Sequence, residues 1–262
     1  MANGCLGYGD LVGAADVTSS GTVGNMTVDR VKDGPIGEVC RLDTSSGGTI
    51  TVVQDVPTPA RLFAVAIPDA MVTDQFLLQV SSTADPSLGD IVNEVLPPVN
   101  PRRCRTFKLL SETVTNYRSL RITCNCTFAP MIGRIWCGPV FQPDYNFALG
   151  YSEGVISNSI NANAARSIAR KKDRRPSQPY YEFQHDWLGE ADAAIARLAM
   201  ITSDTTEQCV WIPDPDDLTD ALEKLCIGAL TEIQPVTLQQ NLWVGDSARP
   251  VVTKRWKIVE DT

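Results

Sequence analysis

Short apolar segments separated by polar turn clusters make up the first half of the chain. From residue 36 to residue 140, strand-length runs alternate with clusters rich in Gly, Pro, Ser and Asp. The run 61–67 is almost continuously apolar, which is typical of a strand covered on both faces. Strict alternation within 119–127 indicates a strand with one buried side. The residues of that side are Leu120, Ile122, Cys124 and Cys126. Six to eight short strands without a long helix predict an antiparallel sandwich of the jelly-roll type.

The hydrophobic pattern changes near residue 150. We therefore expect a jelly-roll-like domain with an irregular N-terminal segment over 1–150, and a polar, basic connector over 151–176. Residues 177–262 return to strand-length apolar runs, which predict a smaller β-rich domain with one main helix. The predicted fold class is therefore mainly β.

The main helix is predicted over about 188–202. Glu190 and Asp192 stand in its first turn, where acids suit the positive end of the helix dipole. Its apolar positions repeat with helical spacing and form a stripe of the kind that surface helices turn toward the core. The members of this stripe are residues 188, 191, 194, 195, 198 and 201.

A basic run occupies the end of the predicted connector. It contains six basic residues and one acid, Asp173, whereas the 262-residue chain as a whole has a formal charge of −8 and a pI of about 4.7. The basic residues are Arg166, Arg170, Lys171, Lys172, Arg174 and Arg175. Two interpretations stay open: an arm that contacts an acidic partner, and a solvated connector. Nucleic acid is the weakest candidate partner, because phosphate binding needs an excess of clustered Lys and Arg.

No catalytic residue is predicted. His185 is the only histidine, and its neighbours show no nucleophile motif. Walker A, GxGxxG and HExxH sequences are missing from the chain, so we expect no cofactor and no enzyme activity. A carboxylate-based hydrolase stays open as a third function class, because paired carboxylates leave no sequence signature.

The eight cysteines are predicted to be reduced and mostly buried. Cys124 and Cys126 would lie on one face of a strand, which makes them weak candidates for a metal or iron–sulfur site. The acids Asp214, Asp216, Asp217 and Asp220 could suggest calcium. They lack the glycine and terminal glutamate of an EF-hand, so a turn followed by a helix N-terminus is the favoured interpretation.

The sequence contains no apolar run long enough to span a bilayer. The first residues lack the basic and apolar regions of a signal peptide, which predicts synthesis and folding in the cytosol.

Several strings of residues resemble one protein family. YRSLRI at 117–122 and GRIWCGPVFQPDYNF at 133–147 are similar to the closing strands of virion structural proteins from tailed bacteriophages. In that family, such strings end a galactose-binding-like β-sandwich. WLGEA at 187–191, WIPDP at 211–215 and the aromatic strand 180–183 resemble the same proteins. The resemblance extends from about residue 60 to the C-terminus.

This resemblance implies a role in assembly. The glycines would allow bends or close approach, the prolines would end strand pairing, and the aromatic residues would be buried. The motif residues concerned are Gly133, Trp136, Gly138, Pro139, Phe141 and Pro143.

The expected protein is a tail-tip, baseplate or minor tail component. It would form a homo-oligomer, contact other tail proteins, and be assembled into the virion tail in the host cytoplasm. The alternative is a carbohydrate-binding module for host-surface glycan, since sandwich loops often bind sugars. Against this alternative, aromatic residues make up only 7% of the chain.

Overall fold

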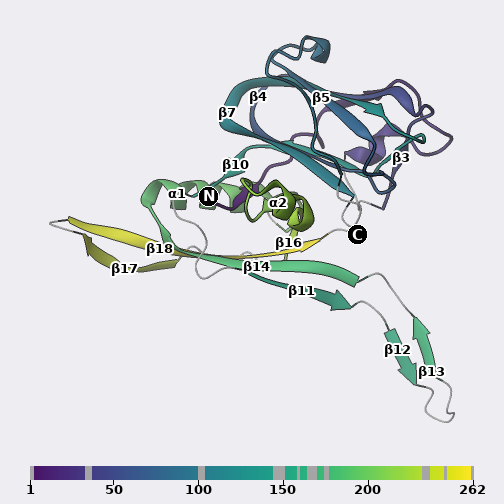
Figure 1. Cartoon of the computed structure of the whole chain (residues 1–262). Helices are drawn as coiled ribbons and strands as arrows, with labels where there is room; N and C mark the ends of the chain where they lie inside the picture. The colour runs from purple at the N-terminus through teal and green to yellow at the C-terminus, as the bar shows by residue number, and fades with distance from the viewer. Residues whose placement is uncertain are drawn as a thin grey trace.

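A computed structural model describes most of the chain (Figure 1). The described ranges are 3–32, 37–99, 104–143, 151–157, 160–163, 170–173, 177–203, 205–231, 237–244 and 247–260. In Figure 1, a curved β-sandwich lies above a long second sheet, and two helices lie between them. The predicted class is confirmed: the protein is mainly β, with an N-terminal sandwich, a smaller β-rich part and one main helix.

The sandwich is built around two strands of 21 residues each, β4 and β7. They pair antiparallel, with register shifts between Val53 and Leu62 where the ribbon curves (Figure 1). The sheet order is β2-β4-β7-β5-β6, with β9 also paired to β4. Its strands are β2 (Asp16–Ser19), β4 (Ser46–Ala66), β5 (Gln75–Ser81), β6 (Val92–Val95), β7 (Arg105–Asn125) and β9 (Arg134–Gly138). Smaller elements are η1 (Val28–Val31), η2 (Pro86–Leu88) and the paired β3 (Cys40–Arg41) and β8 (Met131–Ile132).

The final part of β4 is buried on both faces, as its continuous apolar run predicts. Phe63 and Val65 point into the sandwich core, where they join Ile122. Leu62 and Ala64 belong to a second core shared with strands of the other sheet. Because successive side chains of a strand point to opposite faces, one strand serves both cores.

The second sheet combines both ends of the chain. Its order is β10-β1-β15-β16-β18-β14-β11, with β17 paired to β18. Its strands are β1 (Cys5–Gly7), β10 (Val140–Phe141), β11 (Tyr151–Ser157), β14 (Ser177–Leu188), β15 (Gln208–Ile212), β16 (Cys226–Leu230), β17 (Thr237–Val244) and β18 (Ser247–Glu260). Strand β1 pairs with β10 on one side and β15 on the other, so the first residues of the chain complete a sheet made mainly of its last 110.

Helix α1 (Glu190–Ser203) forms where the periodicity predicts it, but it packs by a different face. Its buried residues are Ala193, Ala196, Ala199 and Ser203. The predicted core-facing stripe was wrong for the helix itself: residues 191, 194, 195, 198 and 201 are exposed, and only Leu188, which precedes the helix, is buried. Small alanine side chains let the helix backbone approach β14 and β18 closely, and the larger aliphatic residues would prevent this approach.

The short helix α2 (Leu218–Lys224) starts at the Asp-rich segment, as the sequence predicts. The Asp217 carboxylate accepts hydrogen bonds from the backbone N–H groups of Thr219 and Asp220, 3.1 Å in each case. This carboxylate is an N-cap, and its oxygens satisfy donors that have no partner within the helix.

A long two-stranded arm leaves the second sheet. Strands β11 and β14 pair from Tyr151 and Phe183 to Ser157 and Ser177. Beyond them, β12 (Ile160–Asn163) pairs with β13 (Arg170–Asp173), and Figure 1 shows this hairpin running away from the body. The segment that the sequence presents as a connector thus contains three strands. We refer to β11, the start of β14 and the β12–β13 hairpin as the arm.

None of the helices in the described ranges is long and apolar enough to cross a membrane.

Candidate functional site

The motif that carries the family resemblance lies where the chain passes from the sandwich to the second sheet. Trp136 in β9 is fully buried, and its indole N–H donates a hydrogen bond to the backbone oxygen of Gln208 in β15, 3.1 Å away. A Cβ atom at Gly138 would lie 2.8 Å from the backbone oxygen of Gly9, so this position requires glycine. These contacts make the motif a joint between the two layers.

Two buried ion pairs strengthen this joint. Arg105 at the start of β7 contacts the carboxylate of Glu260 at 2.6 Å and donates a second hydrogen bond to the backbone oxygen of Leu225, 3.1 Å away. Arg134 pairs with Asp10. Burial raises the pKa of Asp10 to about 6, and the nearby Arg134 guanidinium opposes this rise.

His185 belongs to an aromatic core. Its Nδ1 accepts a hydrogen bond from the indole N–H of Trp256 at 3.2 Å, and its ring contacts Phe141 edge-on. Lys254, on the strand opposite, is buried with its ammonium 4.8 Å from the Trp256 ring centre. Desolvation lowers the pKa of Lys254 to about 8.

Of the two candidate metal-ligating cysteines, Cys124 lies in β7 and Cys126 follows the end of that strand. A thiol–thiol hydrogen bond from Cys126, with desolvation, raises the pKa of Cys124 far above its ordinary value. A raised pKa disfavours the thiolate that binds metals. Across the portion of the chain that the structure describes, three or more His, Cys, Asp or Glu residues nowhere gather in a metal-binding group.

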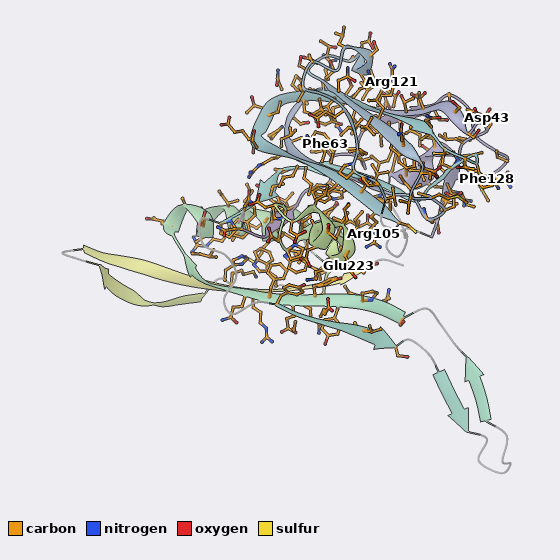
Figure 2. The ribbon with its side chains drawn as sticks, in the orientation of Figure 1. Asp43, Phe63, Arg105, Arg121, Phe128 and Glu223 are labelled. Atoms are coloured by element: carbon orange, nitrogen blue, oxygen red, sulfur yellow. The ribbon has the colours of Figure 1, made fainter. Side chains whose placement is uncertain are left out.

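One end of the sandwich presents an exposed apolar patch that the sequence pattern does not identify. Phe128, which is 61% exposed and labelled in Figure 2, follows β7. The exposed Met71 and Val72 lie in the loop before β5. We call these three residues the loop-end patch. A single aromatic residue in the connection CTFAP at 126–130 is the only sequence signal for it.

A buried carboxylate holds the two loops of the patch together. Asp74 accepts hydrogen bonds from the backbone N–H groups of Met71, at 2.8 Å, and Thr127, at 2.9 Å. Asp69 accepts another from the backbone N–H of Met131 at 2.8 Å. Because charge-assisted hydrogen bonds are among the stronger ones, they fix the loops that carry Phe128.

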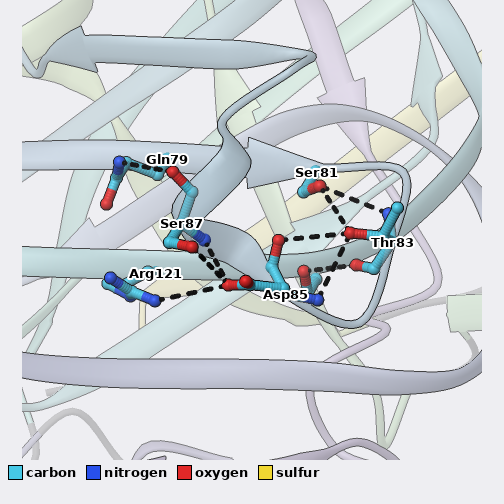
Figure 3. A network of polar contacts seen from close by, with 7 residues as sticks. Gln79, Ser81, Thr83, Asp85, Ser87 and Arg121 are labelled. Atoms are coloured by element: carbon cyan, nitrogen blue, oxygen red, sulfur yellow. Dashed lines mark hydrogen bonds and ion pairs between the residues drawn. The ribbon is translucent and has the colours of Figure 1, made fainter.

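A polar network occupies the loop between β5 and β6 (Figure 3). The Asp85 carboxylate accepts hydrogen bonds from the hydroxyl and the backbone N–H of Ser87, and these bonds lower its pKa. Arg121 lies 3.7 Å from the same carboxylate, and the Ser81 and Thr83 hydroxyls bond to each other. These groups are engaged within the loop, so the network stabilises the loop itself.

A groove of about 450 Å³ lies at the seam between β7 and the segment before α2. One of the charged residues that line it, Arg61, donates hydrogen bonds to the backbone oxygens of Leu110 and Ser111 and to the side chain of Gln142. The Arg61 guanidinium therefore links β4 to β7 and to the residue that follows β10.

Three of the six basic interface candidates lie in the arm. Arg170, Lys171 and Lys172 are in β13, whereas Arg166, Arg174 and Arg175 lie outside the described residues.

Comparison with known proteins gives only distant likenesses. No protein-family model matches the chain, and no curated protein matches it. Among solved structures, the lectin-binding domain of Lectinolysin complexed with Lewis b is 10% identical with a TM-score of 0.40, over 48% of this chain and 94% of that one. A Streptococcus pneumoniae fucose binding module is 13% identical with a TM-score of 0.40, over 50% and 96%. The family 32 carbohydrate-binding module of Streptococcus pneumoniae EndoD is 15% identical with a TM-score of 0.35, over 49% and 97%. The mainly β sandwich fold rests on the strand pairing and cores described above.

Proposed function

We propose that this chain is a non-catalytic structural subunit of a tailed-bacteriophage virion, a tail or baseplate component that assembles with copies of itself and with other tail proteins. The observation that carries the proposal is the arm, which extends past the body of the protein (Figure 1). The phage setting comes from the sequence resemblance over 117–122 and 133–147.

The arm has the features of a segment that needs a partner. A lone two-stranded hairpin is at best marginally stable in water, because it buries little apolar surface. Its outer edge also presents backbone N–H and C=O groups that can pair with another chain. Such a projection gains stability when a neighbouring protein covers it.

Charge supports the same conclusion. The stretch 166–175 has six basic residues and one acid, and the rest of the chain has 17 basic and 30 acidic residues, a formal charge of −13. A basic arm on an acidic body is attracted to other copies of that body at moderate ionic strength.

The proposal is tested on both the purified protein and virus particles. Native mass spectrometry of the full chain should show oligomers that grow with protein concentration. Antibodies against the chain should label one end of the tail in electron micrographs. A chain that stays monomeric at all concentrations and is missing from particles would rule this function out.

A second function, glycan binding at the loop-end patch, is favoured by one observation. Phe128 is an exposed aromatic residue on loops that Asp74 and Asp69 hold in place, and exposed apolar patches commonly mark binding sites. The distant structural neighbours named above include proteins described as binding fucose or complexed with Lewis b.

A glycan array separates this second function from the first. Specific binding by the natural chain that is lost in Phe128→Ala and kept in Phe107→Leu, a change inside the protein, would establish it. Equal signals from the natural chain and Phe128→Ala would exclude this patch as the sugar site.

A further inference from the structure

The outer face of α1 is an apolar stripe that nothing in the described structure covers. Ile195 is 39% exposed, Leu198 is 52% exposed and Ile201 is 79% exposed. We call these three residues the α1 stripe. Single exposed aliphatic residues are ordinary on protein surfaces, but a row of three on one helix face usually marks a contact surface.

The orientation of the helix follows from its packing. Ala193, Ala196 and Ala199 make its buried face, and at 3.6 residues per turn Leu198 lies roughly 150° around the helix from that face. A rotation that buried the stripe would place larger side chains against β14 and β18 and leave alanines outside. The native packing instead leaves the larger side chains available for contact with another molecule.

The arm carries the matching apolar position. Val155 in β11 is 63% exposed, and it is paired in register with Pro179 of β14. Among the residues of the second sheet and its helices whose side-chain exposure is described, which leaves out β17 and the first half of β18, the exposed large apolar residues are Val155, the α1 stripe and Leu218 at the start of α2.

Strand β14 holds the two surfaces apart. The arm begins at its first residues, and α1 follows its last residue, Leu188. From Pro179 to Leu188 is nine residues, or about 30 Å of extended strand. The arm of a chain thus points away from its own α1, as Figure 1 shows, and an equivalent surface is available on a second copy.

We infer that the α1 stripe of one copy is the docking surface for the β11 face of the arm of the next copy, in a head-to-tail arrangement. This inference rests on the proposed function, because it names the contact by which the subunits assemble. The two surfaces are different and lie at opposite ends of β14, so the contact is heterologous and repeats from copy to copy into a ring or a helical filament. The basic strand β13 of the arm then lies against a neighbouring copy whose residues outside 166–175 carry a formal charge of −13.

The charges on α1 favour a protein partner over a membrane. Helices that lie on anionic lipid carry Lys and Arg beside their apolar face. Helix α1 carries Glu190 and Asp192 and only one basic residue, Arg197.

The first test measures assembly of the full chain by sedimentation velocity over a concentration series. Leu198→Glu and Ile201→Glu should each raise the dissociation constant between copies by about tenfold or more, since each places a charge in an apolar contact. Arg197→Glu is the matched control: it adds an acid to an exposed position on the same helix outside the stripe, and should change the constant far less. All three variants should keep the circular dichroism spectrum of the natural chain.

The second test identifies the partner segment by cross-linking. Ile201→Cys and Val155→Cys are purified separately and mixed under oxidised glutathione, which accepts the two electrons and two protons released as each disulfide forms. A covalent dimer should appear in the mixture and not with either variant alone. Background should be low, because six of the eight native cysteines are buried and Cys104 and Cys126 are half-buried.

The outcomes separate this inference from the proposed function. A natural chain that never oligomerises overturns this inference, and the proposed function falls with it only if the chain is also missing from virus particles. If the oligomer persists in Leu198→Glu and Ile201→Glu and no mixed cross-link forms, the α1 stripe is not the contact between copies. Self-assembly through another surface is still supported in that case. Oligomers lost without a mixed cross-link overturn the arm as the occupant of the stripe. Binding of the natural chain to anionic vesicles that Leu198→Glu abolishes, with assembly unchanged, assigns the stripe to a lipid surface and overturns the inference.

Discussion

Arg105 and Glu260 form a buried ion pair, 2.6 Å long, between the first residue of β7 and the last residue of β18. The pair ties the C-terminal strand to the sandwich, and Arg105 also donates a hydrogen bond to the backbone oxygen of Leu225. Three segments that are distant in sequence therefore meet at one guanidinium.

Breaking this pair on one side should destabilise the protein strongly. Glu260→Gln leaves a buried guanidinium without its counter-charge, and the free energy of unfolding should fall by about 3–5 kcal/mol. Urea denaturation followed by tryptophan fluorescence measures the loss. The double variant Arg105→Met, Glu260→Leu should recover part of it, because no lone charge remains.

The ion pair of the half-buried Lys108 with the exposed Glu94 is the control for that experiment, because solvent reaches both groups. Lys108→Met should lower stability by about 1 kcal/mol or less, since solvent screens exposed pairs. Equal losses in Lys108→Met and Glu260→Gln would contradict the role assigned to Arg105 and Glu260.

Gly138→Ala should weaken the joint between the sandwich and the second sheet. The added methyl group would lie 2.8 Å from the backbone oxygen of Gly9 and 2.9 Å from that of Tyr8, and backbone atoms cannot rotate out of the way. We expect a loss of about 1–3 kcal/mol in thermal or urea unfolding. Gly13→Ala, where the methyl group meets no atom within 4 Å, should be neutral or slightly stabilising; a similar loss there would contradict this explanation.

Lys254 should make stability depend on pH in the alkaline range. Its pKa is lowered to about 8 in the folded protein by desolvation, from 10.5 in an unperturbed lysine. Between these values the unfolded chain binds more protons than the folded one, so stability from this group rises as pH increases from about 8 to about 10.5. Comparison of urea midpoints across this range should show that Lys254→Met removes that rise.

Lys257→Met is the matched variant for the pH experiment. Lys257 lies on the same strand, half-buried, with its ammonium 5.3 Å from the Tyr180 ring centre. The stability of the Lys257→Met variant should depend on pH as that of the natural chain does. If the stability of Lys254→Met and that of the natural chain change with pH in the same way, desolvation of Lys254 is not the cause of the rise in stability.

Asp74 should stabilise the two loops of the loop-end patch more than it stabilises the rest of the sandwich. Asp74→Ala removes the acceptor for the backbone N–H groups of Met71 and Thr127, with an expected cost of about 2–3 kcal/mol. Hydrogen exchange should accelerate first at residues 71 and 127–131. Exchange that accelerates uniformly over the sandwich would show that Asp74 supports the whole domain and not the loops.

Patterns of local origin could be predicted from the sequence. The strand at 61–67 is covered on both faces because nearly all its side chains are apolar, and Leu120, Ile122 and Cys124 are buried because they alternate with polar residues. The positions of α1 and of the Asp217 cap follow from helical spacing and from the side-chain acceptor that a helix start requires.

The candidate binding surfaces could be predicted only in part. The basic run at 166–175 could be named as a candidate interface from the sequence. The pairing of β11 with β14 and of β12 with β13 could not be predicted, because it depends on contacts between separate segments. The loop-end patch depends on Asp74 joining two loops whose residues are more than 50 positions apart. A contact between such distant residues leaves no periodic pattern in the sequence.

Periodicity along the sequence determined a mainly β chain, a sandwich at its start and one principal helix, because burial of a strand or helix face is written into the order of its own side chains. Tertiary structure alone decided that α1 packs through alanines, that β1 enters a sheet formed mainly by the last 110 residues of the chain, and that Arg105 meets Glu260. In each case the deciding quantity is the space and charge offered by a distant segment, and a helix with apolar residues on two faces has no local means of choosing between them.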